Sequence, residues 1–178
     1  MWHRHSRVAS QLLALLLALP AGVVQATSIE YRPLDEILLD ADHVLSGRIV
    51  RVEMVDALGR QVRDRDARTG PGLTNRMRFV VEVDDVLFTT CRRPPRRVLV
   101  PLWSAWHYTL GSMQDQLTGS AGLFLLKGAD FQPAYPQDFQ RSPEERPLVE
   151  VGVDALRLER EPASVSCREA PAQGASTR

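Results

Sequence analysis

Residues 76–87 have the sequence RMRFVVEVDDVL, and this stretch decides the fold class. Apolar side chains take alternate positions on one parity: Met77, Phe79, Val81 and Val83. Charged side chains take most positions of the other parity: Arg76, Arg78, Glu82 and Asp84. Because successive side chains of a strand point to opposite faces, this alternation predicts a strand with one face in the core and one in water.

Three segments on either side of this stretch also predict strands. Residues 44–55 are rich in β-branched side chains, and Gly47 within them indicates a bulge or a strong bend. Residues 97–103 alternate, and Pro101 indicates a sheet edge or a strand end because proline has no N–H to donate. Residues 121–127 contain the unbroken apolar run LFLL, which is typical of a strand buried on both faces.

A fifth strand is predicted near the C-terminus, at residues 148–158. Its apolar side chains alternate at first and then continue on the opposite parity: Val149, Val151, Val153, Leu156 and Leu158. The change of parity predicts a bulge at Gly152 or Asp154.

One short helix is predicted before the strands, at residues 33–42. Its apolar side chains recur at helical spacing: Leu34, Ile37, Leu38 and Ala41. Pro33 suits a first helical position, and Asp35 and Glu36 complement the helix dipole. One short N-terminal helix and about five strands predict a mainly β protein, in the form of a small antiparallel OB-like β-barrel.

The first 26 residues have the composition of a secretory signal peptide. Arg4 and Arg7 precede a run of only Leu and Ala from Leu12 to Leu19, and Pro20 ends the run. A membrane anchor is the alternative, but a spanning helix needs about 20 apolar residues. We therefore expect cleavage after Ala26 and a secreted or periplasmic location.

The exported chain is expected to form one domain at residues 27–160, followed by a flexible tail at 161–178. The whole chain has 22 basic and 22 acidic residues, and removal of the signal peptide leaves 20 and 22. This balance gives no electrostatic reason to bind nucleic acid or an anionic membrane. We expect neither as a partner.

The chain has two cysteines, Cys91 and Cys167, and both lie in the exported part. In an oxidising compartment they predict one disulfide bond. Two free thiols, or a cysteine linked to a partner, are the alternatives. Neither a CxxC motif nor metal-ligand spacing is present, so we expect no metal and no other cofactor.

Only two histidines follow the signal peptide, His43 and His107. A Ser-His-Asp or Cys-His site would need one of them as its base. The nucleophile motif G-x-S-x-G and the zinc motif H-E-x-x-H are both absent. We therefore expect a protein that is not an enzyme.

Two loops are candidates for partner binding. Arg92, Arg93, Arg96 and Arg97 surround Pro94-Pro95 and form a stiff basic turn, which is either an electropositive contact for an acidic partner or an exposed hairpin loop. Residues 56–75 have little apolar content, which indicates either a flexible solvated loop or a partner-binding loop.

Residues 103–108, with the sequence WSAWHY, form an aromatic segment in a chain with only 6% aromatic residues. Its candidate binding residues are Trp103, Trp106, His107 and Tyr108. Tryptophan and tyrosine are common anchors of binding surfaces. A lid over the core of a small barrel is the alternative interpretation.

Three segments resemble netrin/TIMP-like domains. The first is Leu38–Val50, with a short helix, Ala41-Asp42, an apolar-Ser-Gly step and a β-branched strand. The others are Phe79–Leu87 and Gly119–Leu126. The resemblance covers residues 34–127 and implies an OB-like barrel. It does not imply zinc chelation by an N-terminal cysteine, because the predicted exported chain begins at Thr27.

The sequence thus predicts an exported, non-enzymatic binding protein whose partner is another exported protein. A small inhibitor or an immunity-type protein that neutralises a secreted enzyme is one specific form of this hypothesis. A hydrolase that uses His107 is one alternative. A carrier that holds a small molecule or lipid inside the barrel is the other.

Overall fold

The structure is a computed structural model of the chain, and it describes residues 29–159, 166–168 and 170. The predicted signal peptide at residues 1–26 lies outside the described residues, as does most of the predicted tail at 161–178. Among the residues described, no helix combines the length and the apolar composition that crossing a membrane requires.

The chain divides into two compact units, Met1–Glu30 and Tyr31–Arg178. Only residues 29 and 30 of the first unit are described, and they form neither helix nor strand. The second unit contains all the helices and strands that follow.

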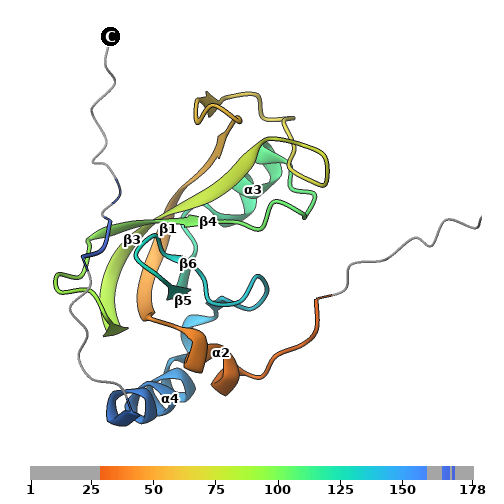
Figure 1. The fold of residues 1–178 in the computed structure, drawn as a ribbon. Coiled ribbons are helices and arrows are strands. Elements are labelled where there is room, and N and C mark those ends of the chain that lie inside the picture. Colours follow the sequence, from red (N-terminus) through yellow and green to blue (C-terminus); the bar gives the residue numbers. More distant parts are fainter. Residues whose placement is uncertain (1–28, 160–165, 169, 171–178) are drawn as a thin grey trace, which may run out of the picture. The chain divides into compact units, whose positions relative to one another are not determined.

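One antiparallel sheet of seven strands dominates the second unit (Figure 1). Its strands are β1 (His43–Val55), β2 (Gln61–Val62), β3 (Arg76–Thr89), β4 (Arg97–Pro101), β5 (Ala121–Lys127), β6 (Gln132–Pro133) and β7 (Gln140–Arg141). The order across the sheet is β4-β3-β1-β5-β6, while β2 pairs with β1 and β7 with β5. The prediction of a mainly β, antiparallel fold is confirmed, and four predicted strands correspond to β1, β3, β4 and β5.

Four helical segments flank the sheet: α2 (Leu34–Asp40), α3 (Leu110–Leu117), the 3-10 helix η1 (Pro143–Glu145) and α4 (Arg146–Glu159). Helices α2 and α4 lie together at one end of the sheet, and α3 lies toward the other end (Figure 1). The predicted short helix at residues 33–42 corresponds to α2. Its first turn carries Asp35 and Glu36, as expected.

Strand β5 separates two hydrophobic cores, because its apolar run is buried on both faces. Phe124 and Leu126 belong to a core shared with β1, β3, β4 and α3. Leu123 and Leu125 belong to a second core, beneath α2 and α4. All four side chains are no more than 1% exposed, which confirms the prediction of a doubly buried strand.

Strand β1 bends where the sequence indicated a bulge. The register between β1 and β3 shifts between Ser46 and Gly47, and again between Ile49 and Arg51. A Cβ atom on residue 47 would collide with the carbonyl oxygen of Glu82 on β3. Glycine at this position therefore allows the two strands to approach while β1 curves.

The sheet does not close into a barrel, so this part of the prediction is not confirmed. Its two terminal strands, β4 and β6, approach each other without pairing. Directly beyond the two ends of β4, Leu102 N–H donates to Met77 C=O at 2.8 Å, and Arg96 C=O accepts from Val83 N–H at 2.9 Å. The backbone N–H and C=O groups of even-numbered residues therefore point toward β3. Those of odd-numbered residues point toward the free edge.

Prolines occupy outward positions on both free edges. On β4 the outward positions include Pro101. Directly after β6, Ala134 N–H donates to Leu125 C=O at 3.0 Å, so the backbone groups of the preceding residue, Pro133, face away from β5. Because neither proline has an N–H group, each edge lacks a donor that a closing ladder would need.

The predicted strand at residues 148–158 is wrong, because this segment is the helix α4. Its fully buried side chains are Val149, Val153 and Leu156, which follow helical rather than alternating spacing. Val151, which the predicted strand places on one face with Val149 and Val153, is 70% exposed. The bulge expected at Gly152 or Asp154 is therefore absent.

A start signal upstream favours this helix over a strand. Ser142 and Glu145 form a reciprocal capping box, with Pro143 at the first position of η1, which leads directly into α4. The valines prefer strands, but burial of one helical face against α2 and the sheet outweighs that preference.

Helix α3 had no counterpart in the sequence-based prediction. Leu110, Met113 and Leu117 recur at helical spacing, and all three contact the first core. This signal was present but short, because α3 has only 8 residues and most of its side chains are polar.

Candidate functional site

The predicted disulfide between Cys91 and Cys167 is confirmed. The two Cα atoms are 5.6 Å apart, and the bond joins positions separated by 76 residues. It ties the segment between β3 and β4 to the described part of the C-terminal segment. Beyond it, Arg168 N–H donates to Ala129 C=O at 3.2 Å, and Ala170 N–H donates to Arg97 C=O at 3.0 Å.

Residues 166–168 and 170 therefore join the two sides of the open sheet at one end. Ala129 belongs to the turn between β5 and β6, and Arg97 begins β4. Ala170 is 7% exposed and thus part of the body of the protein. The rest of the predicted tail lies outside the described residues.

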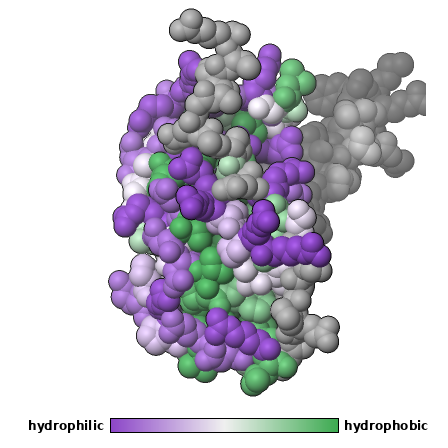
Figure 2. All heavy atoms as spheres, turned by 90° about the vertical axis from the view of Figure 1, so that its left-hand side faces the viewer, coloured by the Kyte–Doolittle hydropathy of each residue, from purple (hydrophilic) through white to green (hydrophobic). Residues whose placement is uncertain are grey.

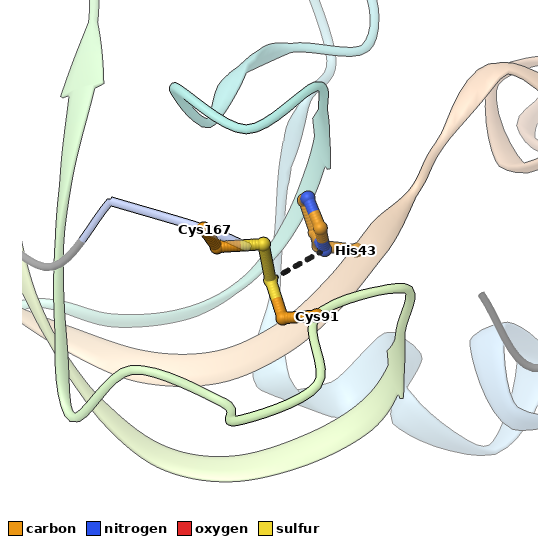
Figure 3. A group of neighbouring side chains, drawn as sticks. All are labelled: His43, Cys91 and Cys167. Carbon is orange, nitrogen blue, oxygen red and sulfur yellow. Dashed lines mark hydrogen bonds between the residues drawn. A yellow bond between two sulfur atoms is a disulfide. The ribbon is translucent and has the colours of Figure 1, made fainter. Parts of the chain in front are cut away.

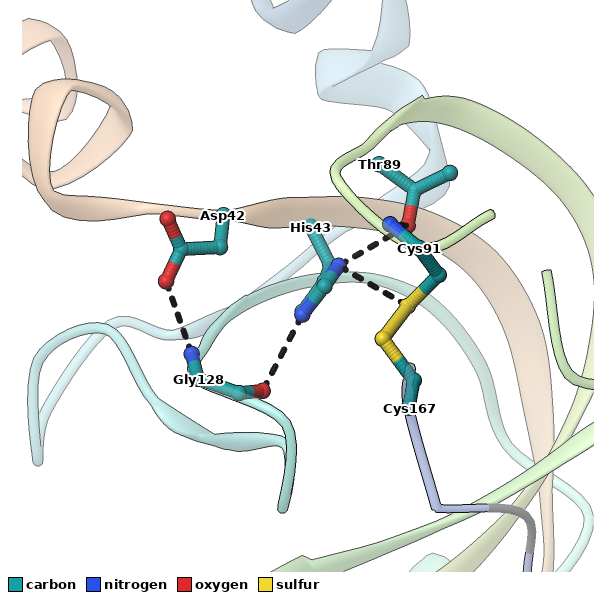
Figure 4. The surroundings of a disulfide bond; sticks show 6 residues. All are labelled: Asp42, His43, Thr89, Cys91, Gly128 and Cys167. Atoms are coloured by element: carbon teal, nitrogen blue, oxygen red, sulfur yellow. Dashed lines mark hydrogen bonds between the residues drawn. A yellow bond between two sulfur atoms is a disulfide. The ribbon is translucent and has the colours of Figure 1, made fainter. Parts of the chain in front are cut away.

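His43, the first residue of β1, lies beside the disulfide (Figure 3). It is 1% exposed, and its Nδ1 is 3.6 Å from the Sγ of Cys91. Its Nε2 lies 3.1 Å from Gly128 C=O, and its Nδ1 lies 2.8 Å from Thr89 Oγ1 (Figure 4). The carbonyl can only accept, so Nε2 carries the proton and Thr89 donates to Nδ1.

The two hydrogen-bond partners of His43, Thr89 and Gly128, make further hydrogen bonds of their own. Cys91 N–H donates to Thr89 Oγ1 at 3.1 Å, and Gly128 N–H donates to a carboxylate oxygen of Asp42 at 2.8 Å. Burial lowers the pKa of His43 below its ordinary value, because the imidazolium form would lose its hydration. His43 is therefore a neutral side chain that joins β1, the end of β3 and the turn after β5.

His43, Cys91 and Cys167 offer three metal-ligand atoms within 4.8 Å of one another. Zinc sites use the thiolate form of cysteine. Both sulfur atoms are instead joined to each other. In the disulfide form this cluster therefore stabilises the fold and offers no thiolate to a metal.

The aromatic segment at residues 103–108 packs against the loop at residues 56–75. Thr69 is fully buried there, and its hydroxyl donates to Trp106 C=O at 2.8 Å. Its N–H donates to Tyr108 C=O at 3.0 Å. The loop thus has an ordered contact with this segment in addition to its solvated side chains.

The four aromatic-segment candidates have different surroundings. The rings of Trp103 and Trp106 are 5.9 Å apart, and those of Trp106 and Tyr108 are 6.0 Å apart. Burial raises the pKa of Tyr108. Trp103 and Trp106 are half-buried, so the segment combines a partial lid over the core with an accessible aromatic surface.

His107 is exposed and lies against Gly70. A Cβ atom on residue 70 would collide with the His107 ring, and Gly70 has a φ of +151°, so both space and backbone favour glycine there. Within the described part of the chain, no hydroxyl, thiol or carboxylate makes a hydrogen bond with the His107 ring. The geometry therefore gives the hydrolase hypothesis no base–nucleophile pair.

The basic turn divides into two parts. Arg92, Arg93 and Arg96 are exposed, as expected for a hairpin loop or an electropositive contact. Arg97 is half-buried, and its Nε is buried with no hydrogen-bond partner among the described residues. Its guanidinium lies 3.8 Å from Glu82, so its side chain belongs to the sheet more than to the exposed turn.

Figure 2 shows the face seen from the left-hand side of Figure 1. Among the coloured residues of this face, hydrophilic ones are in the majority, and hydrophobic ones gather mostly at the centre and the lower end. The face therefore offers a partner mainly polar and charged contacts.

A groove lies between the free edges of β4 and β6, and we name it the edge groove. It consists of two hollows, of about 340 Å³ and about 500 Å³, which share Arg76, Pro101 and Gln132. The other lining residues are Arg78, Leu99, Leu102, Trp103, Ser104, Lys127, Asp130, Phe131, Pro133, Pro136, Arg168 and Ala170. Of the predicted binding residues, only Trp103 lines it.

The edge groove is mainly cationic. Arg78 donates from Nε to Glu53 at 2.9 Å, and Arg168 lies 3.3 Å from Asp130. Arg76 and Lys127 are exposed and have no ion-pair partner among the residues that the structure describes. Sequence reasoning missed this pair, because Arg76 begins β3 and Lys127 ends β5 and only sheet curvature brings them to one groove.

Comparisons with known proteins return no relative. No family model matches the chain, and neither a curated protein nor a solved structure matches it. The resemblance to netrin/TIMP-like domains therefore stays a prediction. The functional interpretation rests on the geometry of the edge groove and its surroundings.

Proposed function

We propose that the protein is an exported, non-enzymatic binding protein whose partner docks at the edge groove. The observation that carries this proposal is the groove itself, which has Trp103 at one side and, on both walls, cations without an ion-pair partner among the described residues. The expected partner is another exported protein. An inhibitor or immunity-type protein remains the specific form of the proposal.

The disulfide supports the exported location. Such bonds persist in oxidising compartments and are rare in the cytosol. Closing a loop across 76 residues stabilises the folded chain by about 4 kcal/mol in the chain-entropy model. A fold that depends on this bond suits a chain that matures outside the cytosol.

Trp103 supports the binding role of the groove. Tryptophan and arginine are enriched among the residues that dominate binding energy at protein interfaces. Trp103 is half-buried and next to a groove, so its ring is held in place while part of it stays accessible. Arg76 lines the same hollow and adds charge without a competing partner among the described residues.

The two alternatives receive less support. The exposed His107 has no hydrogen-bonded nucleophile or acid among the described side chains. For a carrier, the sheet interior would need free volume, but large side chains fill it, including Phe124, Phe131 and Met77.

The test is capture of a partner by the full chain, expressed in its own host and recovered from the exported fraction after chemical crosslinking. Trp103→Ala and Arg76→Glu should each reduce the crosslinked product by about tenfold, as expected for interface hot spots. Arg63→Glu is the matched control, because Arg63 is exposed and does not line the edge groove. Crosslinking that is equal in all four proteins would overturn the proposal.

A further inference from the structure

We propose that the edge groove binds an acidic segment of the partner in an extended conformation, which adds as a strand to the free edge of β4. This inference rests on the function proposed above and specifies the chemistry of its ligand. The occupant of the edge groove is therefore the main chain of a peptide.

The free edge of β4 has backbone groups available for such a strand. The alternation along β4 directs the N–H and C=O of Leu99, and the C=O of Pro101, away from β3. No described residue forms a hydrogen bond with these outward groups. Leu99 and Pro101 both line the edge groove, so the groups face a space that a peptide can enter.

The chain already uses this edge once. Ala170 N–H donates to Arg97 C=O, which is the outward group two residues before Leu99. Residues 166–168 and 170 form neither helix nor turn, and they reach β4 from the disulfide at Cys167. The edge thus accepts a main-chain donor at its first outward position, and no described residue bonds to the next outward positions.

The dimensions fit a short peptide. The outward positions that no described residue bonds run from Leu99 to Pro101, which at about 3.3 Å per residue corresponds to roughly 7 Å. A segment of about three residues would span this length. Addition of a strand to an exposed edge is a common mode of peptide recognition, in which main-chain bonds give affinity and flanking side chains give specificity.

The charges select an acidic segment. Arg76 stands on the β3 side of the groove and Lys127 on the β5 side, and both lack ion-pair partners among the described residues. Asp130, the acidic residue of the lining, is already paired with Arg168. An added strand with a carboxylate at every second residue would place these carboxylates near Arg76 on one wall and Lys127 on the other.

The experiment uses the full chain purified from the exported fraction and a fluorescein-labelled peptide of alternating Glu and Val. The matched peptides are a Lys-and-Val version and two N-methylated Glu-and-Val isomers, each methylated on one set of alternate nitrogens. Fluorescence anisotropy should show binding of the Glu peptide that weakens with added salt, and at least tenfold weaker binding of the Lys peptide. One N-methylated isomer should lose about tenfold more affinity than the other, because only alternate N–H groups face β4.

Two substitutions at residue 99 separate main-chain from side-chain contacts. Leu99→Pro removes the outward N–H and keeps the bonds between β3 and β4, which even-numbered residues make. It should weaken peptide binding about fivefold, as expected for one lost hydrogen bond. Leu99→Ala keeps that N–H and should change binding less than twofold. Circular dichroism checks that both variants fold, and slower hydrogen exchange of the Leu99 amide on peptide addition gives a second readout in the unmodified protein.

A charge-reversed pair tests the acidic preference. Arg76→Glu combined with Lys127→Glu should invert the order of the Glu and Lys peptides, while Arg63→Glu should not. Equal affinities for the two peptides in the unmodified protein, or equal effects of Leu99→Pro and Leu99→Ala, would overturn the inference. Tighter binding of a single-stranded oligonucleotide than of the Glu peptide would also overturn it.

The outcomes also separate this inference from the proposed function. If a partner crosslinks in a Trp103-dependent manner but the Glu peptide does not displace it, the proposed function stands and the strand-addition inference fails. If neither a partner nor the peptide binds at the edge groove, both fail.

Discussion

The two ends of the β4 free edge differ in what faces them. Near Arg97, the chain's own C-terminal segment bonds to the edge and is fixed by a disulfide next to the buried His43. Near Pro101, the edge borders a groove with the half-buried Trp103 and the exposed Arg76. Within the part of the chain that the structure describes, one strand edge is thus covered at one end and borders the groove at the other.

This difference indicates that one end of β4 contributes to stability and the other end to binding. The covered end has buried, hydrogen-bonded groups and a covalent bond, so substitutions there should act on stability. The open end has exposed cations and a partly exposed ring, so substitutions there should act on binding and leave stability nearly unchanged.

Loss of the disulfide should have the largest effect. Replacement of both Cys91 and Cys167 by serine removes the closure of a long loop and should lower the free energy of unfolding by about 2–5 kcal/mol. Urea unfolding measures the change, and the unmodified protein in reducing agent should show a similar loss. An unchanged unfolding midpoint would mean that the C-terminal segment does not stabilise the covered end.

His43→Ala should have the next largest effect. The substitution removes a buried ring with two hydrogen bonds and leaves a cavity, so it should cost about 2–4 kcal/mol. His107→Ala is the control on the open side and should cost less than about 0.5 kcal/mol, because His107 is exposed. Equal losses in urea unfolding would contradict the division between the two regions.

Acid should weaken the covered end through His43. Burial lowers the pKa of His43 in the folded protein, so the unfolded chain binds the proton at a higher pH than the folded chain does. Stability from the neutral ring is therefore complete above the ordinary histidine pKa of 6.5 and falls as the pH drops toward the folded-state pKa.

Thermal unfolding between pH 7.5 and pH 5 measures this dependence. The decrease in Tm should be smaller in His43→Gln than in the unmodified protein, while His107→Gln should retain the full decrease. Parallel curves for all three proteins would show that His43 does not contribute to the pH dependence.

Substitutions at the open end should have the smallest effect on stability. Trp103→Ala and Arg76→Glu should each change the free energy of unfolding by less than about 1 kcal/mol, while both reduce partner crosslinking. Urea unfolding and crosslinking on the same preparations make the comparison. A large loss of stability in Trp103→Ala would instead assign Trp103 to the core lid.

Several parts of the fold were predictable because their signals are local. The alternation at residues 76–87 identified β3, the apolar run at 121–127 identified β5, and Pro101 identified the end of β4. Gly47 identified the bend in β1. In each case, neighbouring residues contain the information, because strand faces, bulges and missing donors are properties of a few consecutive positions.

The helix α4 shows where local signals conflict. Its valines satisfy both an alternating pattern and a helical pattern, and β-branched side chains favour a strand. Burial of Val149, Val153 and Leu156 against α2 decides for the helix, and that partner surface is far away in the sequence. Only the capping signal at Ser142 and Pro143 was available locally.

The candidate site was less predictable than the fold. The sequence singled out Trp103, which lines the edge groove, and the basic turn, whose arginines do not. It did not single out Arg76 and Lys127, since each is an ordinary polar position at a strand end. It also gave His43 no role, because Cys91 and Gly128 are remote in the chain.

By itself, the sequence determined the antiparallel β class, the pair of cysteines that form the disulfide, and the proline at the edge strand β4, Pro101. The tertiary structure alone decided that α4 is a helix, that His43 lies beside the disulfide, and that Arg76 and Lys127 face one groove. The physical reason is the distance along the chain between the residues that interact. Strand faces and missing donors depend on neighbouring residues, whereas burial and electrostatic fields depend on side chains that meet only when the sheet curves.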